Sequence, residues 1–529
     1  MKKVFIVSFL FIGIFISCKN KKGKTVNRDT TITKGTSFNN LFFDSAQLAQ
    51  FISSDSSLKI FEEQLFNFYK QRNYEYAWFD NTGLSEQAYN FYNLLNTTAN
   101  ELKDNNLINP RFLLFYKIFE NNKHNYFKKD LLKAEVLFTS QFFRYAVKAY
   151  NGIDFSATEL GWFIPTKKIN LSSLLDTVLL NKSKNPEVYV PFNSQYKKLQ
   201  QQLQFYYSIQ KKYPTDSLFL DKKTIQLGDT SIIISSIKKR LHVLGDFLSK
   251  DSSNIYDSTL LVAVKQAQNR YGLTISSSIN NSFIQILNRP INSLIEQILI
   301  NLERARWLPQ EKDSNYFLVN IPEFTMHVFD NAVNTWDMNV IVGKAATSTV
   351  IFSGNLKYIV FSPYWIIPNN IVKNEILPSI KKDKNYLENN NMEQYGSSNG
   401  LPMIRQKAGP KNALGVVKFL FPNSYEIYFH DTPNKNYFSA NNRSLSHGCI
   451  RLSQPKKLAS YLLRNDSTFS ETKIDSLMNL PKEKWVGLQK SIPVFIVYFT
   501  SWVDKHGLLN FRNDIYGHDE KMKLKLFIH

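Results

Sequence analysis

The sequence predicts a multidomain α+β protein, with an all-helical N-terminal domain and a small three-helix module before a mixed, β-rich C-terminal domain. A chain of 529 residues exceeds what one hydrophobic core usually supports, so several domains are expected. Apolar residues recur at helical spacing from Leu41 to about Tyr213, and near Leu227 this pattern gives way to three short helical stretches. From Tyr316 onward, short β-rich runs replace the helical spacing.

The N-terminus predicts export. A basic start at residues 1–3 precedes an apolar run of 13 residues, Val4 to Ile16, which is shorter than the about 20 residues that span a membrane. Residues 1–17 are therefore interpreted as a signal peptide, and the polar residues 18–40 as a flexible tether. The end of this signal resembles that of bacterial lipoproteins, which implies lipidation of Cys18 and a periplasmic protein anchored to a membrane.

The helical and β-rich regions have the following predicted limits. The helical domain covers 41–215, the three-helix module 222–292 and the β-rich domain 312–515. A polar segment rich in Asn and Lys, at about 366–412, interrupts the β-rich runs like an insertion. Two runs near the end, Pro493–Val503 and Leu508–Phe511, predict a closing hairpin.

The stretch between residues 428 and 452 carries the predicted chemistry. His447 and Gly448 precede Cys449, and His430 ends an apolar, aromatic run that predicts a strand. A cysteine attacks acyl carbon as the thiolate, and a free thiol with a pKa of about 8.5 needs a neighbouring base or cation at neutral pH. Gly448 permits a tight turn in which backbone N–H groups converge on a developing oxyanion. The residues predict a Cys/His acyl-transfer site.

Other interpretations of these residues remain open. One cysteine near two histidines is compatible with zinc, although a structural zinc site needs four ligands and no second cysteine lies nearby. A lone thiol is also often buried and inert. The net charge of +21 suggests an anionic partner, but the lysines are spread along the chain without the stripe that nucleic-acid binding requires. We expect no nucleic acid, no metal and no cofactor.

The segment Ser446–Arg451 reads Ser-His-Gly-Cys-Ile-Arg. Together with the upstream His430, it resembles the signature of bacterial L,D-transpeptidases. The resemblance implies that Cys449 is the nucleophile and that His430 is the general base and acid. It implies a β-rich L,D-transpeptidase catalytic domain at 312–515, in which the insertion at 366–412 is a capping subdomain.

The same resemblance assigns roles around the thiol. It implies that Ser446, His447 and Gly448 support the site and its oxyanion pocket, and that Arg443 and Arg451 bind substrate. The substrate implied is a peptidoglycan stem tetrapeptide, which loses D-Ala and is joined to an amine of a neighbouring stem or of another protein. Water as the acceptor, giving an L,D-carboxypeptidase or endopeptidase, is an open alternative.

Two further segments resemble parts of the larger members of that family. The aromatic phrase Phe68–Phe79 resembles the opening of their scaffold domain, and its rings are interpreted as helix core. Ala263–Leu273 resembles a peptidoglycan-binding module, from which the chain departs at Ala267. A catalytically inactive wall-binding lipoprotein is therefore an alternative of another class. The chain has two cysteines, and lipidation of Cys18 would leave Cys449 a free thiol.

Overall fold

The computed structural model describes residues 27–33, 39–104, 106–121, 128–150, 157–164, 170–180, 193–308 and 315–527. The predicted signal peptide, Cys18 and most of the tether lie outside these residues. Contacts divide the chain into two compact units, Met1–Tyr145 with Asn170–Pro186, and Ala146–Ile169 with Glu187–His529. Among the described residues, no helix combines the length and the apolar character that a membrane crossing demands.

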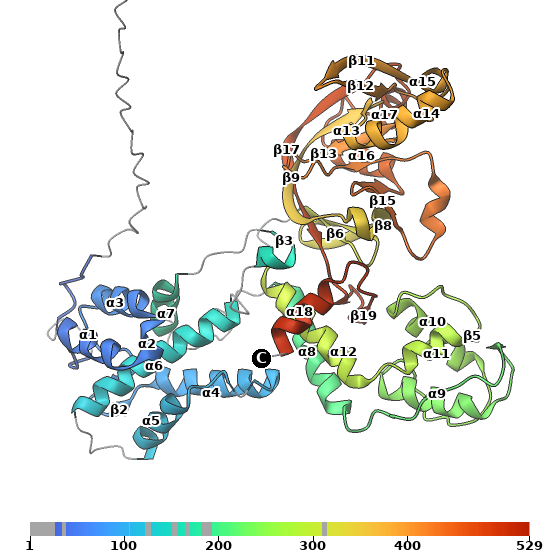
Figure 1. The fold of residues 1–529 in the computed structure, drawn as a ribbon. Helices are drawn as coiled ribbons and strands as arrows, with labels where there is room; N and C mark the ends of the chain where they lie inside the picture. The colour runs from blue at the N-terminus through green and yellow to red at the C-terminus, as the bar shows by residue number, and fades with distance from the viewer. Residues whose placement is uncertain are drawn as a thin grey trace, which may run out of the picture. The chain divides into compact units, whose positions relative to one another are not determined.

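The first unit is helical, with one two-residue β-hairpin (Figure 1). Its elements are α1 (Ser45–Ser54), α2 (Ser56–Lys59), α3 (Glu62–Gln71), β1 (Phe79–Asp80), β2 (Gly83–Leu84), α4 (Glu86–Leu102), α5 (Pro110–Asn121), most of α6 (Lys128–Tyr150) and α7 (Leu171–Leu180). Phe68, Tyr69, Trp78 and Phe79 are all buried, so the interpretation of this aromatic phrase as core is confirmed.

A buried glutamate fixes that aromatic segment. The Glu135 carboxylate accepts hydrogen bonds from the backbone N–H groups of Ala77 (2.7 Å) and Trp78 (3.0 Å). It also accepts one from the Tyr69 hydroxyl at 2.9 Å. Burial raises the pKa of Glu135 to about 7, even though these three donors favour the carboxylate. The network ties α6 to the segment between α3 and β1.

The second unit begins with helices that precede its β-rich part in the chain. Its helical elements are η1 (Ala157–Leu160), α8 (Ser194–Ile209), α9 (Ile232–Val243), α10 (Ser258–Arg270), α11 (Asn281–Leu287) and α12 (Ile291–Arg306), with the short strands β3 (Trp162–Phe163), β4 (Thr224–Ile225) and β5 (Ile279–Asn280). The three helices α9 to α11 confirm the predicted three-helix module. By its contacts α8 belongs to this unit, so the helical region predicted for 41–215 is shared between the two units.

A buried ion pair fastens the three-helix module to the C-terminal hairpin. Arg270, at the end of α10, pairs with Asp246 (2.5 Å) and donates through Nε to the Leu509 carbonyl at 2.7 Å. Leu509 begins β19 (Leu509–Phe511), which pairs antiparallel with β18 (Ser501–Val503) and confirms the predicted closing hairpin. The module is therefore held against the C-terminal segment within this unit.

The β-rich domain is built on a closed ring of eight strands. They are β6 (Tyr316–Asn320), β7 (Thr325–Asp330), β8 (Val333–Gly343), β9 (Ile351–Phe361), β13 (Val417–Leu420), β14 (Phe429–His430), β16 (Ile450–Leu452) and β17 (Lys484–Val497). The strand order is β13-β14-β16-β8-β7-β6-β17-β9, and β9 pairs back to β13. β15 (Ser444–Ser446) pairs with β8, and β3 with β9. α16 (Pro455–Leu463), α17 (Glu471–Met478) and α18 (His518–Phe527) follow in the chain.

The segment predicted as an insertion has its own small core. It contains β10 (Trp365–Ile366), α13 (Asn369–Ile371), η4 (Val372–Ile376), α14 (Leu377–Lys382), α15 (Tyr386–Asn389), β11 (Met392–Ser398) and β12 (Leu401–Gln406). The three strands form a separate sheet in the order β10-β12-β11, and these elements lie together in Figure 1. Ile367, Val372, Ile376 and Ile404 are buried at its centre. The insertion is therefore a folded subdomain that leaves the ring after β9 and returns before β13.

Candidate active site

The predicted base lies on β14, and the predicted nucleophile lies one residue before β16, the parallel strand that pairs with β14. β14 and β16 pair with His430 opposite Arg451, and the Ile450 N–H donates to the Tyr428 carbonyl at 3.2 Å. Side chains alternate along a strand, and directly opposed residues share a face of the sheet. Tyr428 and His430 therefore share a face with Cys449 and Arg451. The ring centroids of Tyr428 and His430 are 5.8 Å apart.

Cys449 is a partly buried free thiol. Its Sγ lies 3.6 Å from the Glu426 carbonyl oxygen, to which it donates a weak hydrogen bond. Burial raises the pKa of Cys449, while contacts with the backbone and hydroxyl of Tyr428 and the charge of Arg451 oppose that rise. The thiol is therefore mostly protonated at neutral pH in this structure.

His430 is held as a neutral base. Its Nδ1 lies 2.5 Å from the backbone carbonyl oxygen of Asp431. A carbonyl oxygen only accepts, so Nδ1 carries the proton and Nε2 is left as the basic nitrogen. Burial is the largest cause that lowers the pKa of His430 to about 3, and the charges of Arg451, Lys418 and Lys435 contribute to the same shift. The imidazole is thus unprotonated across the whole neutral range.

A hydroxyl shapes the turn that leads into Cys449. Ser446 is buried, and its Oγ accepts from the Gly448 N–H (3.1 Å) and donates to the Cys449 carbonyl (2.6 Å). Gly448 has φ +119°, which a residue with a side chain rarely adopts. Ser446 and Gly448 therefore set the conformation of the predicted site turn.

The oxyanion donors differ in detail from the expectation. The Gly448 N–H is bound to Ser446, whereas the Cys449 N–H has no acceptor among the described residues. The His447 side chain is exposed and has no hydrogen-bond partner within the described part of the chain. Within the described residues the Cys449 amide is thus a backbone donor without an acceptor, while the His447 side chain is exposed.

The turn is braced from β8 and from the loop after it. Thr349 donates through Oγ1 to the Gly448 carbonyl (2.8 Å), and Thr347 through Oγ1 to the Ser446 carbonyl (3.2 Å). A Cβ at Gly343 would clash with the Thr347 carbonyl. Only glycine at position 343 therefore allows this close approach of loop and turn.

A tyrosine near the C-terminus supports the same brace. The Tyr516 hydroxyl donates to the Gly343 carbonyl (2.5 Å) and accepts from the Thr349 N–H (3.4 Å). Asp514 accepts from the Tyr498 hydroxyl at 2.6 Å, and Tyr498 in turn accepts from the Tyr516 N–H at 2.9 Å. Tyr516 lies one residue beyond the predicted end of the catalytic domain. The C-terminal segment is therefore part of the support of the site.

Replacing Tyr516 with phenylalanine is expected to lower kcat for acyl transfer by about 10- to 100-fold with little change in KM, because the turn loses a positioning contact. Steady-state kinetics alongside thermal unfolding measures this split. Tyr425→Phe is the control, since Tyr425 is exposed and its hydroxyl has no partner among the described residues. A variant whose Tm falls while kcat stays at the wild-type value would contradict the positioning role.

The two arginines predicted to bind substrate are placed differently. Arg451 lies on the face shared with Cys449, and its buried Nε has no hydrogen-bond partner among the described residues. Arg443 instead donates to the backbone carbonyls of Phe324 (3.0 Å), Ala440 (3.1 Å) and Val340 (3.3 Å). Arg443 thus joins three backbone segments, and Arg451 keeps donor capacity for a ligand.

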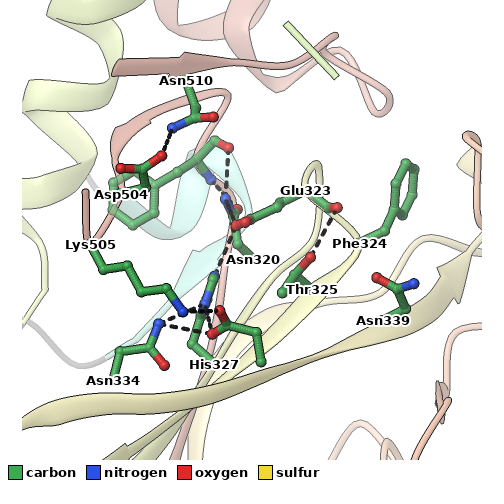
Figure 2. Close-up of polar contacts among 12 residues, drawn as sticks. Asn320, Glu323, Phe324, Thr325, His327, Asn334, Asn339, Asp504, Lys505 and Asn510 are labelled. Atoms are coloured by element: carbon green, nitrogen blue, oxygen red, sulfur yellow. Dashed lines mark hydrogen bonds and ion pairs between the residues drawn. The ribbon is translucent and has the colours of Figure 1, made fainter. Parts of the chain in front are cut away.

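A charged cluster holds the turn that Arg443 contacts (Figure 2). His327 donates to Glu323 (3.0 Å) and to Asp337 (2.7 Å), and Lys505 pairs with Asp337 at 3.2 Å. Although burial alone would lower it, the two carboxylates raise the pKa of His327 to about 10. His327 is therefore a charged structural residue that fixes the turn before β7.

Sequence reasoning missed several residues of this site. Tyr428 was part of the noted stretch, and its side chain contacts the thiol; burial chiefly raises the pKa of its hydroxyl. Lys418 and Thr349 come from distant segments and lack a local motif. Strand pairing with β14 brings Lys418 opposite His430. In the part of the chain that the structure describes, no group of three or more His, Cys, Asp and Glu side chains is placed to hold a metal ion.

Comparisons with known proteins match two regions of the chain. Residues 314–475 match the L,D-transpeptidase catalytic domain, and residues 63–203 match a scaffold domain. A putative L,D-transpeptidase of Haemophilus influenzae is 30% identical over 249 residues, which are 44% of this chain. The match covers 50% of that relative, so this chain spans half of its length.

Solved structures of L,D-transpeptidases are more distant. An L,D-transpeptidase of Stackebrandtia nassauensis is 13% identical with a TM-score of 0.22, covering 54% of this chain and 97% of the other. L,D-transpeptidase 1 of Mycobacterium tuberculosis is 16% identical with a TM-score of 0.17, covering 36% and 63%. The family assignment therefore rests on the sequence matches.

Proposed function

The chain belongs to the L,D-transpeptidase family through its catalytic domain at residues 314–475, and from this premise we propose that it cross-links peptidoglycan by acyl transfer through Cys449. The donor in this proposal is a stem tetrapeptide, and the bond attacked joins its third and fourth residues. The acceptor is an amine of a neighbouring stem, or alternatively of another protein.

The first half-reaction forms a thioester. The Cys449 thiol rotates away from the Glu426 carbonyl, gives its proton to Nε2 of His430 and attacks the scissile carbonyl carbon. The Cys449 N–H donates to the oxyanion of the tetrahedral intermediate. Collapse of the intermediate breaks the C–N bond, and His430 returns the proton to the departing amine of D-Ala.

The second half-reaction reverses these roles. The acceptor amine attacks the thioester carbonyl and gives a proton to His430, and collapse releases Cys449, which regains that proton. The net result is one amide broken and one formed. No step requires a metal or an organic cofactor.

One observation carries the proposal: Cys449, just before β16, and neutral His430, on β14, share a face of paired strands, and Nε2 of the imidazole has no hydrogen-bond partner among the described residues. An inert buried cysteine would need no such base. The alternative of another class is a wall-binding lipoprotein with an inactive domain. It does not explain why a neutral imidazole shares a face with the thiol. Hydrolysis, with water as acceptor, uses the same residues.

The chain's location and its other partners are part of the proposal. We infer a periplasmic lipoprotein, held to a membrane through Cys18, in which the module that contains α9 to α11 contacts the wall. The basic start, the apolar run and Cys18 support the anchor. The fastening of the module through Arg270 supports a fixed rather than tethered wall contact.

Mass spectrometry of the products tests the function. The purified mature protein in detergent is incubated with disaccharide-tetrapeptide, beside Cys449→Ala. A Cys449-dependent dimer lacking one D-Ala is the expected product. Cys449-dependent tripeptide without dimer would instead establish the carboxypeptidase, and the absence of any Cys449-dependent product would favour the binding lipoprotein.

A further inference from the structure

A row of three residues crosses the strands beside the thiol. On β13, Lys418 is directly opposite His430, and on β16 Arg451 is directly opposite His430 on the other side. Opposed residues share a face, so both cations flank His430 on the face that carries Cys449. Neighbouring strands are about 4.8 Å apart, which sets the two cations on either side of the imidazole.

Neither cation forms an ion pair with a described residue, although the charge of Glu483 acts on Lys418. Lys418 is half-buried and makes no hydrogen bond or ion pair with any described residue; its Nζ lies 5.6 Å from the centroid of the Trp485 ring. Glu483 instead accepts from the Tyr364 N–H (3.3 Å) and from Trp485 Nε1 (3.2 Å).

The nearby Lys435 shows the usual arrangement, because it forms an ion pair with Asp431. The buried Arg451 Nε is unpartnered among the described residues. Partly buried cations normally form ion pairs. Lys418 and Arg451 form none with the described residues, which indicates a site for an anion.

The mechanism locates the anion. His430 protonates the leaving amine, so that nitrogen has to lie at Nε2 of the imidazole. In a tetrapeptide donor, the carboxylate carbon of the departing residue is two bonds from this nitrogen. The carboxylate therefore falls beside His430, where Lys418 and Arg451 flank the ring.

We propose that Lys418, with Arg451, binds the terminal carboxylate of the departing residue and selects donors that end one residue beyond the scissile bond. This inference rests on the proposed function and adds a residue that sets its specificity. The enzyme would act at chain ends, and a donor that is amidated or extended at that residue would bind poorly.

The charges around His430 agree with this assignment. Burial lowers the pKa of Lys418 and that of Arg451, as expected for partly buried cations without an ion-pair partner. Both also lower the pKa of His430. A bound carboxylate would offset these charges and make the imidazole a stronger base when a correct donor is present.

A cycle that pairs enzyme and donor variants tests the proposal. Tetrapeptide with a free C-terminus is compared with the same peptide ending in a carboxamide, for wild type and Lys418→Met. We expect the kcat/KM of the wild type to be about 10- to 100-fold higher for the acid than for the carboxamide. In Lys418→Met, kcat/KM should fall for the acid and stay the same for the carboxamide, so that most of this preference is lost. An equal fall on both donors would overturn the proposal.

Two controls separate charge from position. Lys418→Arg keeps the cation and is expected to keep the preference, which also covers the case in which Lys418→Met fails to fold. Lys484→Met removes the same charge from an exposed position that precedes Trp485 on β17, and should leave the preference at its wild-type value. A preference lost in Lys484→Met as well would point to net charge and contradict the site.

Binding measured without turnover separates this proposal from the proposed function. In the Cys449→Ala background, which cannot be acylated, calorimetry compares the acid and the carboxamide with Lys418 present and replaced. Preferential binding of the acid that depends on Lys418 supports the subsite even if no cross-link is ever made. Equal binding of both peptides overturns it even if the transpeptidase is active.

Discussion

Cys449→Ala is expected to reduce acyl transfer by about 10⁴- to 10⁶-fold, because no other group can form the covalent intermediate. Cys449→Ser should be nearly as inactive, since neutral His430 is too weak a base to ionise an alkanol. Single-turnover release of D-Ala measures the loss, and intact-protein mass spectrometry detects the acyl group on the wild type alone.

The same measurement has a clear contrary outcome. The thiol is only partly buried, and Ser446 and Gly448 hold the turn without its sulfur, so Cys449→Ala should unfold at about the wild-type temperature. If this well-folded variant released D-Ala at more than about a hundredth of the wild-type rate, Cys449 would not be the nucleophile.

Replacing His430 with alanine is expected to lower kcat/KM by about 10²- to 10⁴-fold near neutral pH. The pKa of His430 is lowered to about 3 and that of the Cys449 thiol is raised, so both are neutral between pH 5 and 8 in the wild type. The wild-type rate should therefore be nearly flat in this range. In His430→Ala the reaction depends on free thiolate, and its rate should rise about tenfold per pH unit below the thiol pKa.

The matched control is His447→Ala, because His447 is only two residues from Cys449 and yet its side chain is exposed. It should retain most of the wild-type rate and the flat pH profile. A large loss in His447→Ala with a small one in His430→Ala would reverse the assignment of the base. The pH dependence of kcat/KM for the three proteins decides between the two histidines.

The sequence predicts those parts of the site that follow from neighbouring residues. Ser446, Gly448 and Cys449 form one turn, so their spacing is enough to bring them together. The fold class is confirmed for the same reason: helical spacing, the three short helices α9 to α11 and the closing hairpin are local patterns. The family resemblance is confirmed by the match of residues 314–475.

Contacts between distant segments had no local pattern. Lys418 meets His430 through the register of β13 with β14, and Tyr516 reaches Gly343 from 173 residues away. The apolar, aromatic run that ends at His430 forms a strand only at Phe429–His430, and Glu426 ahead of it has a left-handed φ of +56°. Burial also decides the charge state: sequence suggests a thiol activated by a base, while the structure gives a neutral thiol beside a neutral imidazole.

The pairing of β9 with β13, which closes the ring, affects how readily the strands next to the site open locally. Because the eight strands form a ring, β14 and β16 lie inside the strand order, and neither offers an unpaired backbone edge on which another chain could template a strand. β14 carries His430, β16 begins one residue after Cys449, and each of these strands is bonded on both sides. Fraying begins at loose ends, so strands that are paired on both sides are expected to hold His430 and the start of β16 in place better than edge strands would.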